Sequence, residues 1–308
     1  APLAPSSTAE HLSAMLDNCG ARLVLRDHEV AAQWPLHAGA ALRCVALDDA
    51  AEAGEPWDAF VASCVASELV GVEALSGIPG AVGSTPIQNV GAYGQEVSDT
   101  LWSLRTWDRH ERAYRTFANA DARFGYRTSR FKEEPGRYVV LSVTFQLLQG
   151  DTSAPVRYAE LARTLGVQPG RRAPLAATRD AVLALRRAKG MVLDAADHDT
   201  WSAGSFFTNP LLDADAAARL PADAPRYPAP DGRVKSSAAW LIEHSGFGKG
   251  FGTPPATLST KHVLALTNRG GARASEIVAL ARVVRDGVRE RFGLSLVPEP
   301  VFVGLSLD

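Results

Sequence analysis

The chain has 308 residues, of which 46% are hydrophobic, so it is long enough to bury a large core in two or three domains. Its net charge of −2 at pH 7 excludes the basic surplus that is typical of nucleic-acid-binding proteins. No apolar stretch approaches the ~20 residues that a membrane-spanning helix needs, and no signal peptide is visible, so we expect neither nucleic acid nor a membrane as a partner.

Helices and strands are mixed along the chain. In chain order the pattern predicts a helix over 7–19, a strand over 21–26, a helix over 55–70, strands over 101–108, 113–117 and 138–148, helices over 178–189, 236–246 and 274–293, and a strand over 294–304. Ser275 is the expected cap of the last helix, and Gly246 and Gly293 are expected stops. Because no regular βαβ rhythm is present, the predicted class is α+β.

The cysteines and histidines do not indicate a metal site. Cys19, Cys44 and Cys64 lack CxxC spacing, and the seven histidines form no HxxxH or HExxH pair. We therefore expect no metal and no disulfide framework, and we predict buried thiols in a reducing cytoplasm.

The most unusual stretch is residues 77–96, GIPGAVGSTPIQNVGAYGQE. Glycines let a backbone pass close to a ligand and offer unblocked N–H donors to anionic oxygens. The stretch matches neither GxxxxGK[ST] nor a GxGxxG that opens a helix. A plain loop rich in turns is the alternative to a ligand-binding loop.

Further motifs follow in order, and together with this stretch they resemble a known family. They are FGYRTSRFK (124–132), VRYAEL (156–161), AGSFFTNP (203–210), SAAWLIEHSGFGKG (237–250), LSTKHVLALTNRGGA (258–272) and RFGLSLVPEPVFVG (291–304). From about residue 52 to its end, the chain resembles the UDP-N-acetylenolpyruvoylglucosamine reductases, the MurB family.

The resemblance implies an FAD-binding fold of the type-2 (PCMH-like) kind with a separate substrate domain. We expect a shortened flavin-type subdomain over 1–45 and 299–308, a second flavin-type subdomain over 46–194, and a substrate-binding domain over 195–298. The implied reaction is hydride delivery from FAD, reduced by NADPH, to an enolpyruvyl group, followed by protonation of the resulting enol.

The resemblance also implies site residues. Ser205 matches the proton donor, and Arg127 and Glu299 match the pair that polarises the substrate carboxylate and stabilises the enol. The expected substrate-binding residues are Tyr126, Tyr158, Lys189, Asn209 and His244. If FAD is bound, the expected cofactor-binding residues are Gly77, Pro79, Gly80, Gly83, Ser84, Gln88, Asn89, Gly91 and Tyr93.

Each of these residues has a plainer interpretation. Ser205 could cap a helix or form a turn, Arg127 could make a surface salt bridge, and Glu299 could be a solvated charge. His244 could read a phosphate, but a partly exposed helix residue is the favoured interpretation. As an ordered set inside matching motifs, the residues favour an active site.

The N-terminal region departs from the family pattern. The family carries a TT…GG segment and a GxGSN loop for the flavin pyrophosphate, whereas this chain has DHEVAAQW at 27–34. Asp27 and Glu29 would repel a diphosphate, and side chains there would block close backbone approach. A further shortening lies between residues 47 and 51.

The motifs that match the family pattern, together with the N-terminal segments that depart from it, lead to three functional hypotheses. The favoured one is a MurB-like enzyme without any cofactor, in which Ser205, Arg127 and Glu299 carry out isomerisation, cyclisation or elimination on an anionic or enolisable small molecule, in the biosynthesis of a specialised metabolite. The alternative is a working reductase with FAD and NADPH. The third is a non-catalytic protein that binds a nucleotide sugar. The sequence leaves the oligomeric state open.

Overall fold

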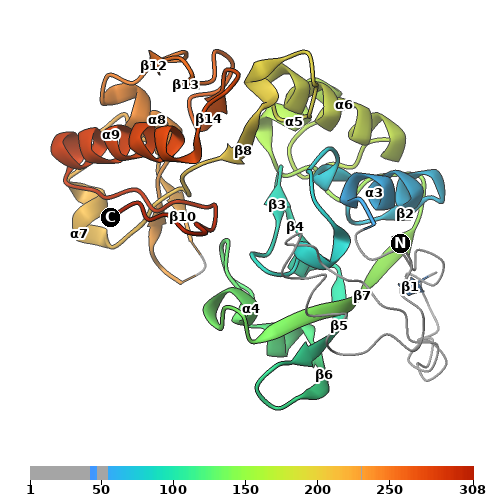
Figure 1. The fold of residues 1–308 in the computed structure, drawn as a ribbon. Helices are drawn as coiled ribbons and strands as arrows, with labels where there is room; N and C mark the ends of the chain where they lie inside the picture. The colour runs from blue at the N-terminus through green and yellow to red at the C-terminus, as the bar shows by residue number, and fades with distance from the viewer. Residues whose placement is uncertain (1–41, 47–54, 230) are drawn as a thin grey trace. The chain divides into compact units, whose positions relative to one another are not determined.

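The computed structural model describes residues 42–46, 55–229 and 231–308, and for 42–46 it describes the backbone only. The predicted elements over 7–19 and 21–26, and the segment 27–34, lie outside these residues. The chain divides into two compact units, Ala1–Leu185 and Arg186–Asp308, and each is described by itself (Figure 1).

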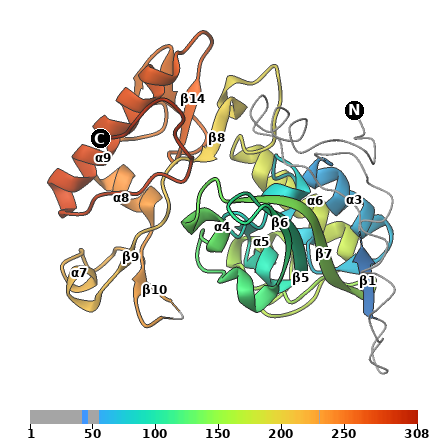
Figure 2. The same cartoon turned by 60° about the horizontal axis from the view of Figure 1, so that its bottom comes forward.

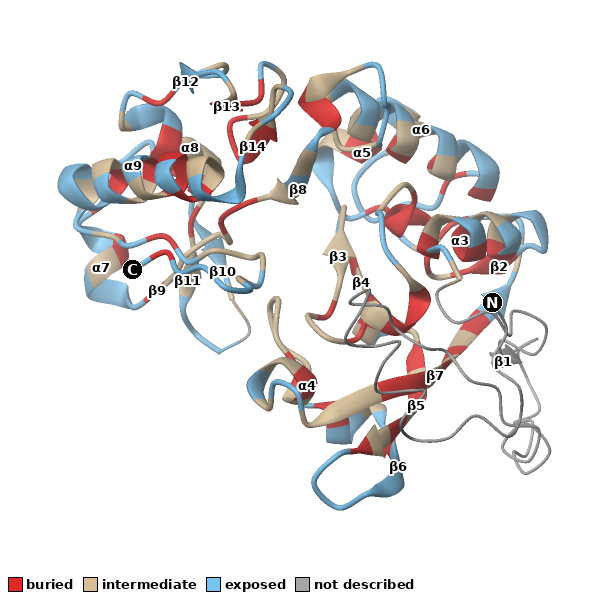
Figure 3. Ribbon diagram, in the orientation of Figure 1, coloured by how far each residue is buried: buried red, intermediate tan, exposed pale blue. Residues whose placement is uncertain are grey.

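An antiparallel sheet forms the centre of unit 1. Its strands run in the order β1-β7-β5-β6, and β2 also pairs with β7. Their bounds are Leu42–Ala46 for β1, Leu69–Val70 for β2, Leu101–Asp108 for β5, Ala113–Ala118 for β6 and Tyr138–Gln149 for β7. Buried and less buried positions alternate along β5 and β7, as the two-residue period of a strand requires (Figure 3).

The described part of unit 1 also contains helices and a hairpin. Its first described helix, α3, covers Trp57–Ala66, and its Trp57 and Phe60 rings pack with Phe145 of β7. The other helices and the hairpin strands are α4 (Arg130–Glu133), α5 (Ala159–Leu165), α6 (Leu175–Ala188, whose last three residues fall in unit 2), β3 (Gly91–Ala92) and β4 (Gln95–Glu96). Short 3-10 turns lie at Glu73–Leu75, Val82–Ser84, Val97–Asp99 and Asn119–Ala122.

Unit 2 has two small antiparallel sheets and a core built on two helices. One sheet has the order β12-β13-β14-β8 and the other the order β10-β11-β9. The strands are β8 (Ser202–Ser205), β9 (Leu211–Leu212), β10 (Tyr227–Pro228), β11 (Val234–Lys235), β12 (Gly252–Thr253), β13 (Ala256–Leu258) and β14 (Ala265–Asn268). The helices are α7 (Ala214–Ala218), α8 (Ala238–His244) and α9 (Ala274–Phe292), with a 3-10 turn at His198–Thr200. Leu241 and Ile242 of α8 and Val284 and Val288 of α9 are buried in one cluster, and Figure 2 shows both helices.

The predicted α+β class is confirmed, and several predicted elements match the structure. The strand over 101–108 agrees residue for residue, and the strands over 113–117 and 138–148 each extend one residue further. The helix over 274–293 ends as expected at Gly293, which has a φ of 68°. Its predicted cap is wrong, because Ser275 lies inside α9 and the Glu276 carboxylate accepts the Arg273 amide instead.

The predicted strand over 294–304 is also wrong. In the structure this segment contributes a single bridge, between Phe207 and Pro298, and forms no strand. Pro298 and Pro300 have no backbone N–H to donate to a ladder, which explains the difference. Residues 299–308 lie in unit 2, and the predicted division at 45, 194 and 298 stays a prediction.

Two expected absences concern only the described part of the chain. Within it, no helix is both long enough and apolar enough to cross a bilayer. Within the same residues, no group of three or more histidine, cysteine, aspartate or glutamate side chains is placed to share a metal ion. Cys64 is buried as predicted, and burial raises the pKa of its thiol to about 12.

Candidate functional site

The glycine-rich segment 77–96 is held at its start against α3. The Gly77 amide donates to the Asp58 carboxylate at 2.6 Å, and the Trp57 amide donates to the Gly80 carbonyl at 2.8 Å. Gly77 and Gly80 have φ angles of 72° and 114°, which residues with a side chain rarely adopt. The segment therefore follows a fixed path and has bare backbone at both glycines.

The Gln95 side chain is a buried cross-link. It accepts the Ala74 amide at 2.8 Å and donates to Glu73 at 3.0 Å. Glu73 has no exposed surface and also accepts the amides of Gly71 and Ala154, at 2.7 and 2.6 Å. Because buried polar groups need such partners, Glu73 and Gln95 fix the end of the segment.

Asn89 is a second buried cross-link. Its Nδ2 donates to Glu96 at 2.8 Å and to the Gly125 carbonyl at 3.2 Å, and its Oδ1 accepts the Ser98 amide at 3.0 Å. The side-chain amides of Asn89 and Gln95, which lie among the glycines in the sequence, therefore hold the loop in shape. Nothing in the sequence pattern separates this internal role from contact with a ligand.

Arg127 is tied to the backbone of the β3–β4 hairpin. Its Nη2 donates to the Gly91 carbonyl at 2.5 Å and its Nη1 to the Asn89 carbonyl at 3.4 Å, while Glu96 lies 4.0 Å from Nη1. The guanidinium carbon also lies 5.3 Å from the centre of the Tyr126 ring. Since only 19% of the side chain is exposed, Arg127 is a partly buried, oriented cation.

The motif at 124–132 is joined to the glycine-rich segment at two more places. Ser129 Oγ donates to the Ile87 carbonyl at 2.6 Å, and Lys132 Nζ lies 3.4 Å from Gln88 Oε1. The ring of Tyr93, which lies between β3 and β4, meets that of Tyr158 edge to face, with ring centres 5.4 Å apart. Two motifs that are far apart in sequence, 124–132 and 156–161, therefore converge on residues 87–96 within unit 1.

Ser205 and Glu299 lie on adjoining segments of unit 2. Ser205 is the last residue of β8 and pairs with Ala265, and it follows Gly204, which has a φ of 80°. The amide of Phe206 donates to the Leu264 carbonyl at 2.7 Å, and the amide of Glu299 donates to the Phe206 carbonyl at 2.8 Å. One backbone hydrogen bond thus fixes the position of Glu299 relative to the serine.

The remaining predicted substrate residues of unit 2 are placed as follows. Asn209 Oδ1 accepts the Ala238 amide at 2.9 Å at the start of α8. Lys189 follows the end of α6 and is partly buried. His244 is exposed at the end of α8, stacks on Trp240 with ring centres 3.8 Å apart, and places Nδ1 2.8 Å from the Trp240 carbonyl. His244 is thus an exposed helix residue, and its role in substrate binding stays a prediction.

An acidic pair that the sequence analysis missed organises the start of unit 2. Asp199 is buried and accepts the Thr260 amide and Arg269 Nη1, both at 2.8 Å, while Asp197 pairs with Lys261. Burial alone would raise the pKa of Asp199, but its hydrogen bonds and Arg269 hold it below the ordinary value. The hydrogen bond from Lys261 lowers the pKa of Asp197. The sequence signal that could have revealed these acids is the run Ser-Thr-Lys at 259–261, which supplies their partners Thr260 and Lys261.

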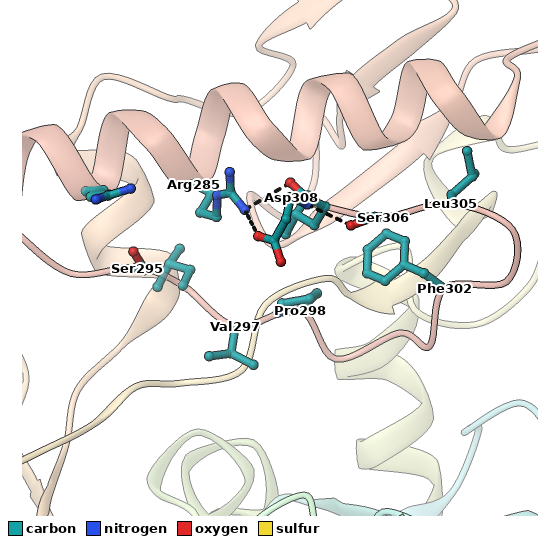
Figure 4. Close-up of a pocket in the computed structure, with 11 residues that line it drawn as sticks. Arg285, Ser295, Val297, Pro298, Phe302, Leu305, Ser306 and Asp308 are labelled. Carbon is teal, nitrogen blue, oxygen red and sulfur yellow. Dashed lines mark hydrogen bonds and ion pairs between the residues drawn. The ribbon is translucent and has the colours of Figure 1, made fainter. Parts of the chain in front are cut away.

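A pocket of about 480 Å³ lies between α9 and the C-terminal segment of unit 2 (Figure 4). Arg285 of α9 reaches into it, donates to the Leu307 carbonyl at 3.0 Å and pairs with Asp308 at 3.1 Å. Pro298 lines the pocket and precedes Glu299, but neither Ser205 nor Glu299 is among its lining residues. The pocket is therefore separate from the predicted catalytic residues.

Comparison with known proteins shows the family. The model of the UDP-N-acetylenolpyruvoylglucosamine reductase C-terminal domain matches residues 195–303. The chain is 58% identical over 258 residues to the UDP-N-acetylenolpyruvoylglucosamine reductase of Cutibacterium acnes, covering 83% of this chain and 68% of the relative. It is 59% identical over 266 residues to that of Streptomyces avermitilis, covering 83% of this chain and 73% of the relative.

The chain belongs to the UDP-N-acetylenolpyruvoylglucosamine reductase (MurB) family. A solved relative from Thermus caldophilus, titled UDP-N-acetylenolpyruvylglucosamine reductase, shares the fold with a TM-score of 0.50. It is 22% identical, and the match covers 79% of this chain and 68% of that one. The resemblance predicted from the motifs is confirmed.

The predicted loss of redox function is wrong. The favoured hypothesis was an isomerase, cyclase or lyase without a cofactor, but relatives that match 83% of the chain at 58–59% identity carry the reductase name. The prediction gave decisive weight to residues 27–34, which lie outside the described residues. A short acidic stretch cannot outweigh the ordered motifs over the rest of the chain, so the reductase alternative is the better supported one.

Proposed function

We propose that this chain reduces UDP-N-acetylenolpyruvoylglucosamine, with FAD as its resident cofactor and NADPH as the reductant. The observation that carries the proposal is the 58–59% identity to reductases of that name over 258 and 266 residues. The expected location is the cytoplasm of a bacterium, in line with the bacterial sources of these relatives.

The described residues of unit 1 fit a flavin dinucleotide. Among the described residues, an added Cβ at Gly80 would meet only Ser84 Oγ, at 3.3 Å, so within this part of the chain the bare backbone leaves room for a ligand to approach. The residues that would hold the group are Gly77, Pro79, Gly80, Gly83, Ser84, Gln88 and Tyr93. Asn89 and Gly91 would support it indirectly, because both are engaged inside the loop.

When bound, the reduced flavin supplies a hydride to the enolpyruvyl double bond. The role of Arg127 is to bind and orient the substrate carboxylate, for which its planar, doubly donating head is suited. Its two hydrogen bonds, to the carbonyls of Asn89 and Gly91, fix the plane of that head before the substrate arrives. Orientation in advance lowers the entropy cost of reaching the reactive geometry.

The Ser205 hydroxyl supplies the proton at the carbon next to the one that receives the hydride. A serine hydroxyl is a weak acid, so it protonates only a strongly basic enol or enolate, and it must be held in place. The end of β8 and the Glu299–Phe206 hydrogen bond provide a fixed backbone for this. The carboxyl group of Glu299 would stabilise the enol, and Tyr158, Lys189 and Asn209 would hold the diphosphate.

The direct test is turnover of the purified protein. We expect a yellow protein that oxidises NADPH only when UDP-N-acetylenolpyruvoylglucosamine is present. The Ser205→Ala variant should keep its flavin and lose at least about 10²-fold in kcat, because the proton donor is gone. A thiol can also donate a proton, so Ser205→Cys should recover part of the loss.

Two results would contradict the proposal. One is a colourless protein that acquires no flavin absorbance when FAD is added. The other is a yellow protein that does not oxidise NADPH in the presence of the substrate. Thr208→Ala is a suitable control variant, because Thr208 lies three residues further along the same segment, where its hydroxyl donates to the Val297 carbonyl at 3.3 Å.

A further inference from the structure

The Arg127 head contacts the hairpin of residues 91–96 and Asn89, which precedes the hairpin. Two backbone carbonyls, those of Gly91 and Asn89, accept hydrogen bonds from it, and the Glu96 carboxylate faces the same Nη1 at 4.0 Å. Carbonyl dipoles set the plane of a guanidinium but carry no full charge. Glu96 is the acidic side chain that approaches this head among the described ion pairs.

Glu96 is itself held in a defined position. Asn89, which is buried, donates to Glu96 Oε2 at 2.8 Å, and the Glu96 amide donates to Asp99 at 2.9 Å. The opposite oxygen, Oε1, faces Arg127. The carboxylate therefore bridges a rigid amide and the guanidinium.

The absence of a side chain at Gly91 makes this arrangement possible. A Cβ there would lie 2.8 Å from Glu96 Cγ and 2.9 Å from Arg127 Nη1. Contacts under 3.0 Å do not occur at real Cβ atoms, so one of the two side chains would have to move. The glycine thus brings the acid and the cation together across the hairpin.

We propose that Glu96 is a positioning residue that, held by Asn89, orients Arg127 toward the substrate carboxylate. The inference rests on the proposed reductase function. The Glu96 charge has two opposite effects on the reaction. It fixes the direction of the guanidinium, which favours the reactive geometry. It also repels the incoming carboxylate, which weakens ground-state binding.

These two effects predict a split between turnover and binding. In Glu96→Gln the side-chain oxygen can still accept from Asn89, while the charge that faces Arg127 is lost. We expect kcat to fall by about 10- to 100-fold through misorientation, with KM unchanged or lowered. A loss of folded protein would also lower the apparent kcat at unchanged KM, so turnover is expressed per molecule of folded protein, measured by circular dichroism.

Glu133→Gln is a matched control. Glu133 pairs with Arg123 at 3.3 Å in the same unit, and its side chain is 48% exposed, against 37% for Glu96. The same neutralisation of an arginine-paired acid there should leave kcat and KM as in the unchanged protein.

Two measurements separate positioning from a structural role. The first is a double-mutant cycle in which Glu96→Gln is made in the Arg127→Ala background, where it should have no further effect on kcat. The second is equilibrium binding of the substrate and of UDP-N-acetylglucosamine, which lacks the enolpyruvyl carboxylate. Glu96→Gln should change the ratio of the two dissociation constants, and Glu133→Gln should leave it unchanged.

The outcomes distinguish this inference from the proposed function. If the unchanged protein does not turn over the substrate, the proposed function fails, while the ratio of dissociation constants still tests Glu96. If the protein turns over and Glu96→Gln matches it, the inference is overturned. Additive losses in the cycle, or a Glu96→Gln variant that does not fold, would also overturn it, because both point to a structural role.

Discussion

At the scale of single residues, Asp108 is the clearest determinant of acid stability in unit 1. Its side chain has no exposed surface and lies between Arg137, at 2.9 Å, and Arg115, at 3.4 Å. The hydrogen bonds from Arg137 lower the pKa of Asp108 to about 2. The folded protein therefore holds this carboxylate ionised at a pH where the unfolded chain, with an aspartate pKa of about 3.9, would bind a proton.

We expect Asp108→Asn to lower the melting temperature by several degrees at neutral pH, because it leaves Arg137 without its buried acid. The stabilisation from the lowered pKa is fully present above about pH 4 and is lost as the pH falls toward about 2. The difference between the two melting curves should therefore shrink over that window. Thermal denaturation at a series of pH values measures it, and Asp121→Asn, at an exposed position, is the control. A constant difference down to pH 2 would refute the assignment.

The site residues show what the sequence could predict at this scale. The residue types and their order identified the family. The roles of Ser205, Arg127 and Glu299, which the resemblance implied, stay predictions. The sequence did not reveal that Asn89 and Gln95 face inward, because an amide that bonds a ligand and one that bonds a buried carboxylate look the same in a sequence. The pairing of Glu96 with Arg127 was missed for a different reason, because the two residues lie 31 positions apart in the sequence.

At the scale of elements, α9 contains Gly287 in its interior, although glycine has a low helix propensity. An added Cβ at Gly287 would lie 2.4 and 2.5 Å from two ring atoms of Phe247. In an exposed helix Gly→Ala stabilises by about 1 kcal/mol. Here we expect Gly287→Ala to destabilise the protein by about 1–3 kcal/mol, because the core is overpacked.

Chemical denaturation measures this change, and a second substitution tests its cause. Phe247→Leu removes the ring atoms that the new methyl group would meet. In the Phe247→Leu background, Gly287→Ala should lower the free energy of unfolding by less than it does in the unchanged protein, since the two positions share one contact. Equal costs in both backgrounds would mean that Phe247 is not the reason for the glycine.

The elements also show where periodicity succeeds and fails. The strands β5 and β7 alternate between buried and less buried positions over most of their length because one sheet face packs on the core, so their bounds were predictable within a residue. The segment 294–304 has the same apolar composition, but its prolines prevent a ladder, and Val301 and Val303 are 80% and 89% exposed. The prediction relied on the apolar composition of the segment and gave no weight to its two prolines.

At the scale of the whole molecule, the two units have separate cores. Trp57, Leu104 and Phe145 belong to a cluster in unit 1, and Leu241 and Val284 to one in unit 2. These clusters share no residue among those that the structure describes. Each unit therefore has the means to unfold as a cooperative unit of its own.

We expect calorimetry to resolve two transitions that respond to different changes. Leu241→Ala removes a fully buried side chain at a cost of about 2–5 kcal/mol and should lower the unit 2 transition alone. The matched Leu104→Ala should lower the unit 1 transition alone. FAD at about 100 times its dissociation constant should add about 2.7 kcal/mol to the stability of unit 1 and so raise the temperature of its transition. The proposed FAD contacts in the described chain lie in residues 77–93, which belong to this unit. A single transition that both leucine substitutions lower equally would show that the two cores unfold together.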